Sequence, residues 1–112
     1  MPRYKVIDFI QPNKCISFIK ESHFRLIPNF NWEYGWGNGY CSIGPRHKLY
    51  KVGYDFIDTI DVHGGLTYAN LEDSRWVLGY DCCHYGDTIY TCSKQFVEEE
   101  TLRLKEQLEN YK

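Results

Sequence analysis

The stretch GYDCCHYGD, residues 79–87, places two carboxylates, two adjacent thiols and an imidazole within nine residues. Such groups can bind a metal, act as acid, base or nucleophile, or line a pocket. A closed structural zinc site needs about four ligands, usually in paired short spacings, and this stretch lacks a second pair. If the chain continues here as a strand, Asp81 and Cys83 face one side while Cys82 and His84 face the other. We therefore expect no bound metal and no other cofactor.

Two alternatives for this stretch stay open. The first is an open metal site, which keeps about three protein ligands. Its candidate ligands are His63, Asp81, His84 and Asp87. The second is a nucleophilic cysteine, which would need an imidazole to favour the thiolate. Free cysteines that follow an apolar strand are usually core residues, so nucleophilic catalysis is the least favoured function.

The stretch HGGLT, residues 63–67, is the second candidate for chemistry. Two consecutive glycines let backbone N–H groups approach an anion closely, and the Thr67 hydroxyl adds a further donor. No Walker lysine is present and no helix clearly begins here. A β-bulge with a hydrogen-bonded His63 is therefore slightly favoured over a phosphate loop. The basic residues Arg46 and Lys48 keep a small anionic ligand under consideration.

The elements that position these residues are clearest around the aromatic segment. Aromatic residues alternate with other types over residues 30–36, which predicts a strand with its aromatics on one face. Together with Tyr40 this face could stack a flat ligand, although burial under a helix is favoured. Asn38-Gly39 predicts a type I′ hairpin turn, with residues 40–43 as the returning strand.

The remaining elements complete an α+β domain over residues 1–112. Residues 1–10 suit an edge strand, and residues 15–19 a short strand or a helical turn. Residues 56–62 suit a strand ending at Val62, residues 70–74 a loop, and residues 75–80 a central strand. A helix capped by Ser93 should run to the C-terminus. We expect a twisted, mainly antiparallel sheet of about five strands with this helix packed on one face.

Composition limits the class of partner. The chain has 112 residues, a net charge of −2 and a pI near 6, which argues against binding duplex nucleic acid through phosphates. No apolar run is long enough to span a membrane, so no membrane partner is expected. Five cysteines without a CxxC motif or a secretory signal indicate free thiols in a reducing cytoplasm. The helix stripe could also form the seam of a homo-oligomer.

Four segments together carry a resemblance to a known family: WGNGYCSI, the His47 loop that leads to Tyr54, VHGGLTYA and WVLGYDCCHYGDT. They resemble a family of small uncharacterised proteins encoded by bacteriophages, prophages and plasmids. Tyr80 stands where the family often has Phe, and Cys82-Cys83 where small residues are common, which weakens a catalytic role for the thiols. The ligand-binding residues implied by the resemblance are His47, Tyr54, His63, Gly64, Gly65, Thr67, Trp76, Asp81, His84 and Asp87.

Three functions follow as expectations. The favoured one is a phage-type protein of the bacterial host cytoplasm that binds a small anionic or nucleotide-like ligand and sequesters a nucleotide immune signal. The second is a small metal-assisted or His/Asp-dependent hydrolase of a phosphorylated metabolite, with His63 or His84 as general acid and base. The third is a protein inhibitor of a host defence complex that uses exposed aromatic residues as its contact surface.

Overall fold

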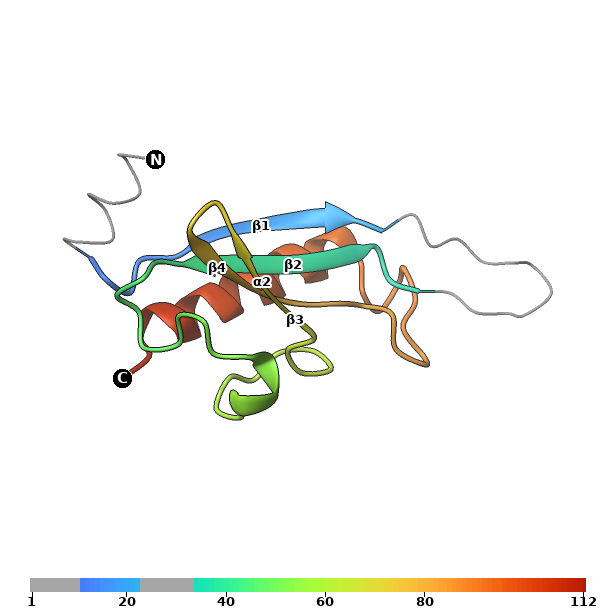
Figure 1. The fold of residues 1–112 in the computed structure, drawn as a ribbon. Coiled ribbons are helices and arrows are strands. Elements are labelled where there is room, and N and C mark those ends of the chain that lie inside the picture. The colour runs from blue at the N-terminus through green and yellow to red at the C-terminus, as the bar shows by residue number, and fades with distance from the viewer. Residues whose placement is uncertain (1–10, 23–33) are drawn as a thin grey trace.

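The computed structural model describes residues 11–22 and 34–112 of the chain. Four strands form one sheet in this part: β1 (Ile16–Glu21), β2 (Gly37–Ile43), β3 (Tyr68–Glu72) and β4 (Arg75–Tyr80). Their order is β1-β2-β4-β3, and neighbouring strands are antiparallel. The helix α2 (Lys94–Glu109) runs across one face of the sheet (Figure 1). The α+β class is confirmed, with four strands described where about five were expected. The edge strand expected over residues 1–10 lies outside the described residues.

The hairpin between β3 and β4 turns at Asp73-Ser74. These two residues have φ angles of 51° and 67°, and Glu72 pairs with Arg75 on either side of them. Two consecutive positive φ angles are typical of a type I′ turn. The loop expected over residues 70–74 is therefore confined to Asp73-Ser74, because β3 extends to Glu72. Polar residues are tolerated in β3 because one face of an antiparallel sheet can meet water.

Strand β2 runs straight through Asn38-Gly39, so the hairpin turn expected there is wrong. Gly39 pairs with Ile19 on β1 and with Tyr80 on β4. A Cβ atom on Gly39 would lie 2.0 Å from Thr101 Oγ1 on the helix, so the glycine permits close helix packing. Residues 40–43 belong to this same strand. Residues 30–33 of the expected aromatic strand lie outside the described part of the chain.

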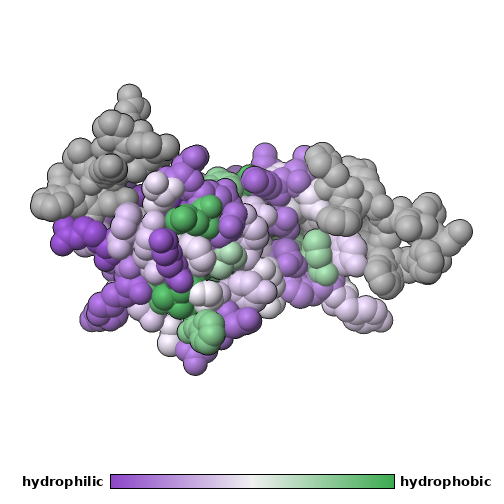
Figure 2. Space-filling model, in the orientation of Figure 1, coloured by the Kyte–Doolittle hydropathy of each residue, from purple (hydrophilic) through white to green (hydrophobic). Residues whose placement is uncertain are grey.

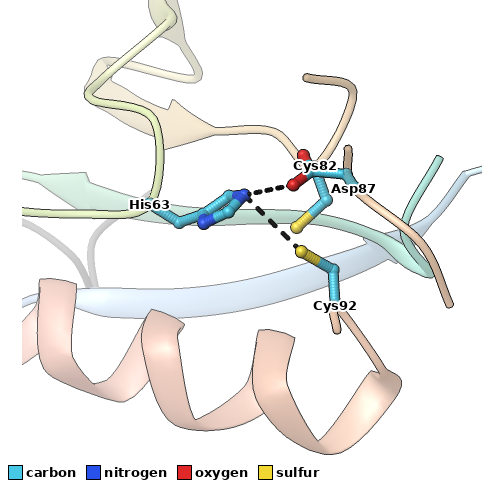
Figure 3. Close-up of side chains that lie close together, drawn as sticks. All are labelled: His63, Cys82, Asp87 and Cys92. Atoms are coloured by element: carbon cyan, nitrogen blue, oxygen red, sulfur yellow. Dashed lines mark hydrogen bonds and ion pairs between the residues drawn. The ribbon is translucent and has the colours of Figure 1, made fainter. Parts of the chain in front are cut away.

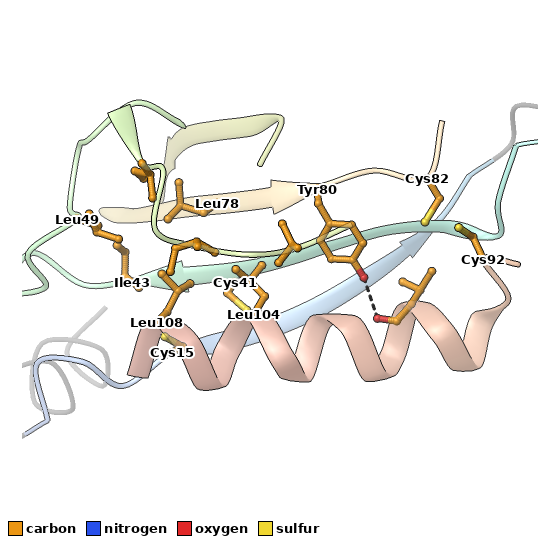
Figure 4. Close-up of a cluster of buried hydrophobic side chains, with 14 residues drawn as sticks. Cys15, Cys41, Ile43, Leu49, Leu78, Tyr80, Cys82, Cys92, Leu104 and Leu108 are labelled. Atoms are coloured by element: carbon orange, nitrogen blue, oxygen red, sulfur yellow. Dashed lines mark hydrogen bonds between the residues drawn. The ribbon is translucent and has the colours of Figure 1, made fainter. Parts of the chain in front are cut away.

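Helix α2 begins where expected. The Ser93 side chain accepts a hydrogen bond of 3.2 Å from the Phe96 N–H and caps the first turn. The inward stripe of the helix packs on the sheet and builds the core (Figure 4). This part of the core consists of Val97, Leu104 and Leu108 from the helix and Cys41, Ile43, Leu78 and Tyr80 from β2 and β4.

The opposite face of the sheet carries a row of aromatic rings. Phe18 and Tyr40 stack with centroids 5.0 Å apart, and Tyr68 meets Tyr40 edge-on at 5.4 Å. Tyr40 therefore lies on the face away from α2, and the expectation that the helix buries it is wrong. Gly79 allows this arrangement, because a Cβ atom there would lie 2.4 Å from Tyr40 Cδ1.

The connection between β2 and β3 contains a single 3-10 turn, Tyr54–Phe56, and no strand. The strand expected over residues 56–62 is therefore wrong, although Ile57, Ile60 and Val62 are buried in the core. The backbone here finds hydrogen-bond partners on the helix, since Gln107 donates to the Asp61 carbonyl at 2.8 Å and accepts from its N–H at 2.7 Å. The Gln107 side chain thus makes the backbone hydrogen bonds that a neighbouring strand would otherwise make.

Large apolar side chains are also found on the surface. In the view of Figure 2 the strongly hydrophobic residues form separate small patches among hydrophilic ones. Tyr85 and Tyr90, on the loop between β4 and α2, are 100% and 83% exposed. Within the described residues, no helix is both long enough and apolar enough to cross a bilayer.

Candidate functional site

Four residues implied by the two motifs converge at the end of β4. His63 comes from the turn before β3, and Asp81, His84 and Asp87 come from the loop that follows Tyr80. The central strand ends at Tyr80, as expected, and the chain does not continue as a strand to His84. The reason lies in two side chains, because Asp81 Oδ1 accepts from the Cys83 N–H at 3.0 Å and Asp87 Oδ2 from the His84 N–H at 2.9 Å. Such local hydrogen bonds favour turns over strands.

The Asp87 carboxylate is the centre of this network. Oδ1 accepts from His63 Nε2 at 2.9 Å, and Oδ2 lies 3.1 Å from His84 Nδ1. Its side chain is only 8% exposed. Burial would raise the pKa of Asp87, but the His84 N–H and the two imidazoles outweigh burial and hold the pKa below its usual value. Asp87 is therefore a carboxylate that orients two histidines at once.

His84 is the more accessible of the two imidazoles. Its side chain is 35% exposed, and its Nε2 lies 3.6 Å from Asp81 Oδ1, longer than a direct hydrogen bond. The Thr67 hydroxyl donates to Asp81 Oδ2 at 2.8 Å and holds that carboxylate in place. His84 thus has one nitrogen fixed by Asp87 and the other beside an anchored carboxylate.

The Gly-Gly turn supports His84. Gly64 has a φ of +69°, and a Cβ atom on it would lie 2.2 Å from His84 Cε1. Two N–H groups of the turn have partners within the protein: the His63 N–H donates to Glu100 Oε2 at 2.6 Å, and the Gly65 N–H donates to the Val62 carbonyl at 2.9 Å. The glycines therefore allow a tight turn on which the His84 imidazole packs. The hydrogen-bonded His63 is as expected, but the β-bulge expected here is wrong, because residues 63–67 belong to no strand.

Two buried cysteines complete the cluster. Cys82 and Cys92 are each 1% exposed, and Cys92 Sγ lies 3.5 Å from His63 Nε2. One ligand atom from each of His63, Cys82, Asp87 and Cys92 lies within 4.8 Å of all the others. Figure 3 shows both sulfurs and the Asp87 carboxylate on the side of the His63 ring that carries Nε2. Burial raises the pKa of both thiols, which disfavours a free nucleophilic thiolate.

Cys92 is the residue that sequence reasoning missed. It belongs to neither motif and lies directly before the helix cap, where a buried cysteine is an ordinary core residue. The argument against a metal depended on the absence of a second ligand pair near Cys82, and Cys92 with His63 supplies one. The one available signal is the position of Cys92, where the loop from Cys82 leads into the helix.

Three of the implied site residues lie elsewhere. His47 is 3% exposed, lies at the C-terminal end of α2, and bonds the Leu108 carbonyl through Nε2 at 2.8 Å. The Trp76 indole donates to the Val52 carbonyl at 2.9 Å. Tyr54 belongs to the short 3-10 turn and is 40% exposed. No hydrogen bond or ion pair described here joins these residues to the His63 cluster.

Comparison with known proteins gives no match of any of the three kinds. No family model, no curated protein and no solved structure matches this chain. The resemblance to phage and prophage proteins therefore stays a prediction, and the functional argument depends on the geometry of the site.

Proposed function

We propose that the protein is a small hydrolase in which Asp87 and His84 form a general acid–base dyad. The observation that supports this most directly is the contact of 3.1 Å between the buried Asp87 carboxylate and His84 Nδ1. A carboxylate in this position fixes the tautomer of the ring and stabilises its protonated form. The opposite nitrogen, Nε2, is then the atom that exchanges a proton with water or with substrate.

The surrounding residues favour water as the nucleophile. The buried thiols of Cys82 and Cys92 have raised pKa values. Burial and nearby carboxylates also raise the pKa of the Cys83 thiol. No activated cysteine is therefore present in the cluster. Asp81, anchored by Thr67, lies where it can help to orient a water molecule beside His84 Nε2. The substrate class that we propose is a small phosphorylated metabolite.

A substrate panel tests this proposal. The full chain is incubated with aryl phosphate monoesters and diesters, nucleotides and sugar phosphates, and the release of product is followed. Wild type should hydrolyse at least one class, and His84→Gln should lower kcat by about 100-fold to 10,000-fold, the usual contribution of a general acid or base. Tyr85→Ala is the matched control, because the neighbouring Tyr85 is fully exposed and should leave the rate unchanged.

Two results would contradict hydrolysis and support the other predicted functions. The first is a nucleotide that binds in calorimetry and is recovered chemically unaltered, which favours the predicted ligand-sequestering protein. The second is a cellular activity that is abolished by changes at Tyr85 and Tyr90 and left intact by His84→Gln. That result favours the predicted inhibitor, which uses exposed aromatics as its contact surface.

A further inference from the structure

We propose that the chain binds one Zn²⁺ ion through His63 Nε2, Cys82 Sγ, Asp87 Oδ1 and Cys92 Sγ. These four atoms come from three places: the turn before β3, the loop after β4, and the residue before the α2 cap. The proposal concerns metal binding itself and does not rest on hydrolysis. Its test therefore reads out the metal and not the activity.

The donor set suits zinc better than the hard cations. Thiolates and imidazoles are the ligands that Zn²⁺ prefers, and carboxylates also serve, whereas Mg²⁺ and Ca²⁺ select oxygen. Four ligands around zinc in a tetrahedron lie roughly 3.3–3.8 Å from one another, given bonds of about 2.0–2.3 Å. The cluster is close to that size, with 2.9 Å from Nε2 to Oδ1, 3.5 Å from Nε2 to Cys92 Sγ, and no separation above 4.8 Å.

The backbone holds both cysteines in position before any ion binds. Gly35 donates to the Cys82 carbonyl and Trp36 to the Cys92 carbonyl, each at 2.8 Å. A Cβ atom on Gly35 would lie 2.6 Å from Cys82 Cβ and 2.4 Å from Cys92 Cβ. The strip before β2 therefore packs between the two cysteines and sets their spacing. Preorganisation of this kind reduces the entropy lost when the ligands are fixed.

Outer contacts orient the other two ligands. The His84 N–H and Nδ1 both contact Asp87 Oδ2, which leaves Oδ1 directed at His63. Phe96 packs edge-on against the His63 ring at 5.4 Å, and Glu100 holds the His63 N–H. Hydrogen-bonded carboxylate ligands and fixed imidazoles are typical of protein metal sites. Metal binding would release the two thiol protons into solvent, and the neutral His63 ring would bind through Nε2 with its one proton on Nδ1.

With four protein ligands the site is closed, which is typical of structural zinc. The ion would clamp the loop between Cys82 and Cys92 onto the turn at His63. It would also fix Asp87, and therefore His84, without itself meeting a substrate. The neighbouring Cys83 lies outside the four-atom cluster, although it is adjacent to a ligand in sequence. Cys83 is thus a matched control within the same dipeptide.

The test uses the full chain, purified with a phosphine reductant so that Cys82 and Cys92 cannot join as a disulfide. Elemental analysis should find one zinc per chain, and Co²⁺ substitution should give intense tetrahedral d–d bands with thiolate charge transfer. Cys92→Ser and His63→Gln should each weaken binding in a chelator competition by at least about 100-fold, since changes to outer-shell partners alone cost about 10-fold to 100-fold. Cys83→Ser should leave the affinity and the cobalt spectrum unchanged.

X-ray absorption at the zinc edge of wild type keeps the proposal testable if the variants fail to fold. Two sulfur scatterers near about 2.3 Å and two nitrogen or oxygen scatterers near about 2.0–2.2 Å are expected. A chain that takes up no zinc, a six-coordinate all-oxygen cobalt spectrum, or an equal loss of affinity in Cys83→Ser would overturn the assignment.

Discussion

Gly64 and Gly65 are adjacent and share a left-handed backbone, with φ angles of +69° and +80°. Their surroundings differ. A Cβ atom on Gly64 would enter the His84 ring, whereas one on Gly65 would meet nothing within 4 Å. The pair therefore separates two reasons for glycine, the backbone conformation and the space that the imidazole needs.

We expect Gly64→Ala to cost more stability than Gly65→Ala. The left-handed conformation costs an alanine about 1–2 kcal/mol at either position. At Gly64 a steric term of roughly 1–3 kcal/mol is added, because the His84 ring must move. Urea unfolding gives the two costs, and NMR of the imidazoles reports the displacement of His84. Equal costs, with His84 unmoved in Gly64→Ala, would show that the ring does not depend on this glycine.

The sequence predicts that the imidazoles and carboxylates of the cluster lie together, but it does not predict that two buried thiols lie beside them. His63 lies in the turn before β3, and Asp81, His84 and Asp87 lie in the loop after β4. Both segments carry recognisable motifs, so their convergence could be predicted. The partnership of Cys82 with Cys92 depends on how the intervening loop folds, and no local pattern encodes that. The resemblance implies that His47 belongs to the site, yet its imidazole bonds the Leu108 carbonyl near the C-terminal end of the helix.

Among the elements, β2 is the hardest to recognise from the sequence, because glycines recur along it and in the segment before it. Gly35, Gly37 and Gly39 recur with a period of two, and a Cβ atom on any of them would collide with a neighbouring segment. Asn38-Gly39 therefore has a sequence typical of a turn, although both residues lie inside a closely packed strand. The type I′ turn that the structure shows, Asp73-Ser74, contains no glycine. The sequence therefore favours a hairpin at Asn38-Gly39 instead.

The turn at Asp73-Ser74 should accept the sequence that its geometry favours. Changing Asp73→Asn together with Ser74→Gly supplies the preferred type I′ pair and should raise the free energy of unfolding by about 1 kcal/mol. The measurement is the urea midpoint at unchanged m-value. Ser74→Val, which puts a β-branched side chain at a φ of 67°, should lower it. A loss of stability in the Asn-Gly variant would argue against a type I′ turn here.

The strand order itself could not be read from local patterns. β4 was identified, since its apolar run is typical of a central strand, and it does lie between β2 and β3. Residues 56–62 carry the same kind of apolar residues without forming a strand, because Gln107 satisfies the Asp61 backbone. Burial alone thus leaves a strand and an irregular buried segment indistinguishable.

At the scale of the whole molecule, two loop segments, each containing a histidine, contact α2 at different points along its length. His63 lies against Phe96 and Glu100 in the first half of the helix, and His47 contacts Leu108 near its end. His47 is the more buried of the two, with 3% of its surface exposed. Its Nδ1 accepts from the Leu49 N–H at 3.0 Å, so its Nε2 carries the proton donated to Leu108.

His47 should make the fold sensitive to acid. Burial lowers the pKa of His47 below its ordinary value of 6.5, more than the hydrogen bond to Leu108 raises it. As the pH falls, His47 therefore becomes protonated to its cation in the unfolded chain before it does so in the folded protein. The stability contributed by neutral His47 is complete above about pH 6.5 and is lost as the pH falls below that value. Urea unfolding between about pH 8 and pH 5 should show a shallower pH dependence for His47→Gln than for wild type. Parallel curves would show that His47 titrates alike in both states.

All the residues of the His63–Asp87 cluster and both its cysteines lie within one run of thirty positions, 63–92, wrapped around the hairpin β3–β4. Contacts between residues so close in sequence close short loops, and the entropic cost of closing a loop is lower when the loop is shorter. Low contact order favours early formation during folding. The ligands can therefore gather around this hairpin before β1 has joined the sheet, so that the site would template the fold as well as be supported by it.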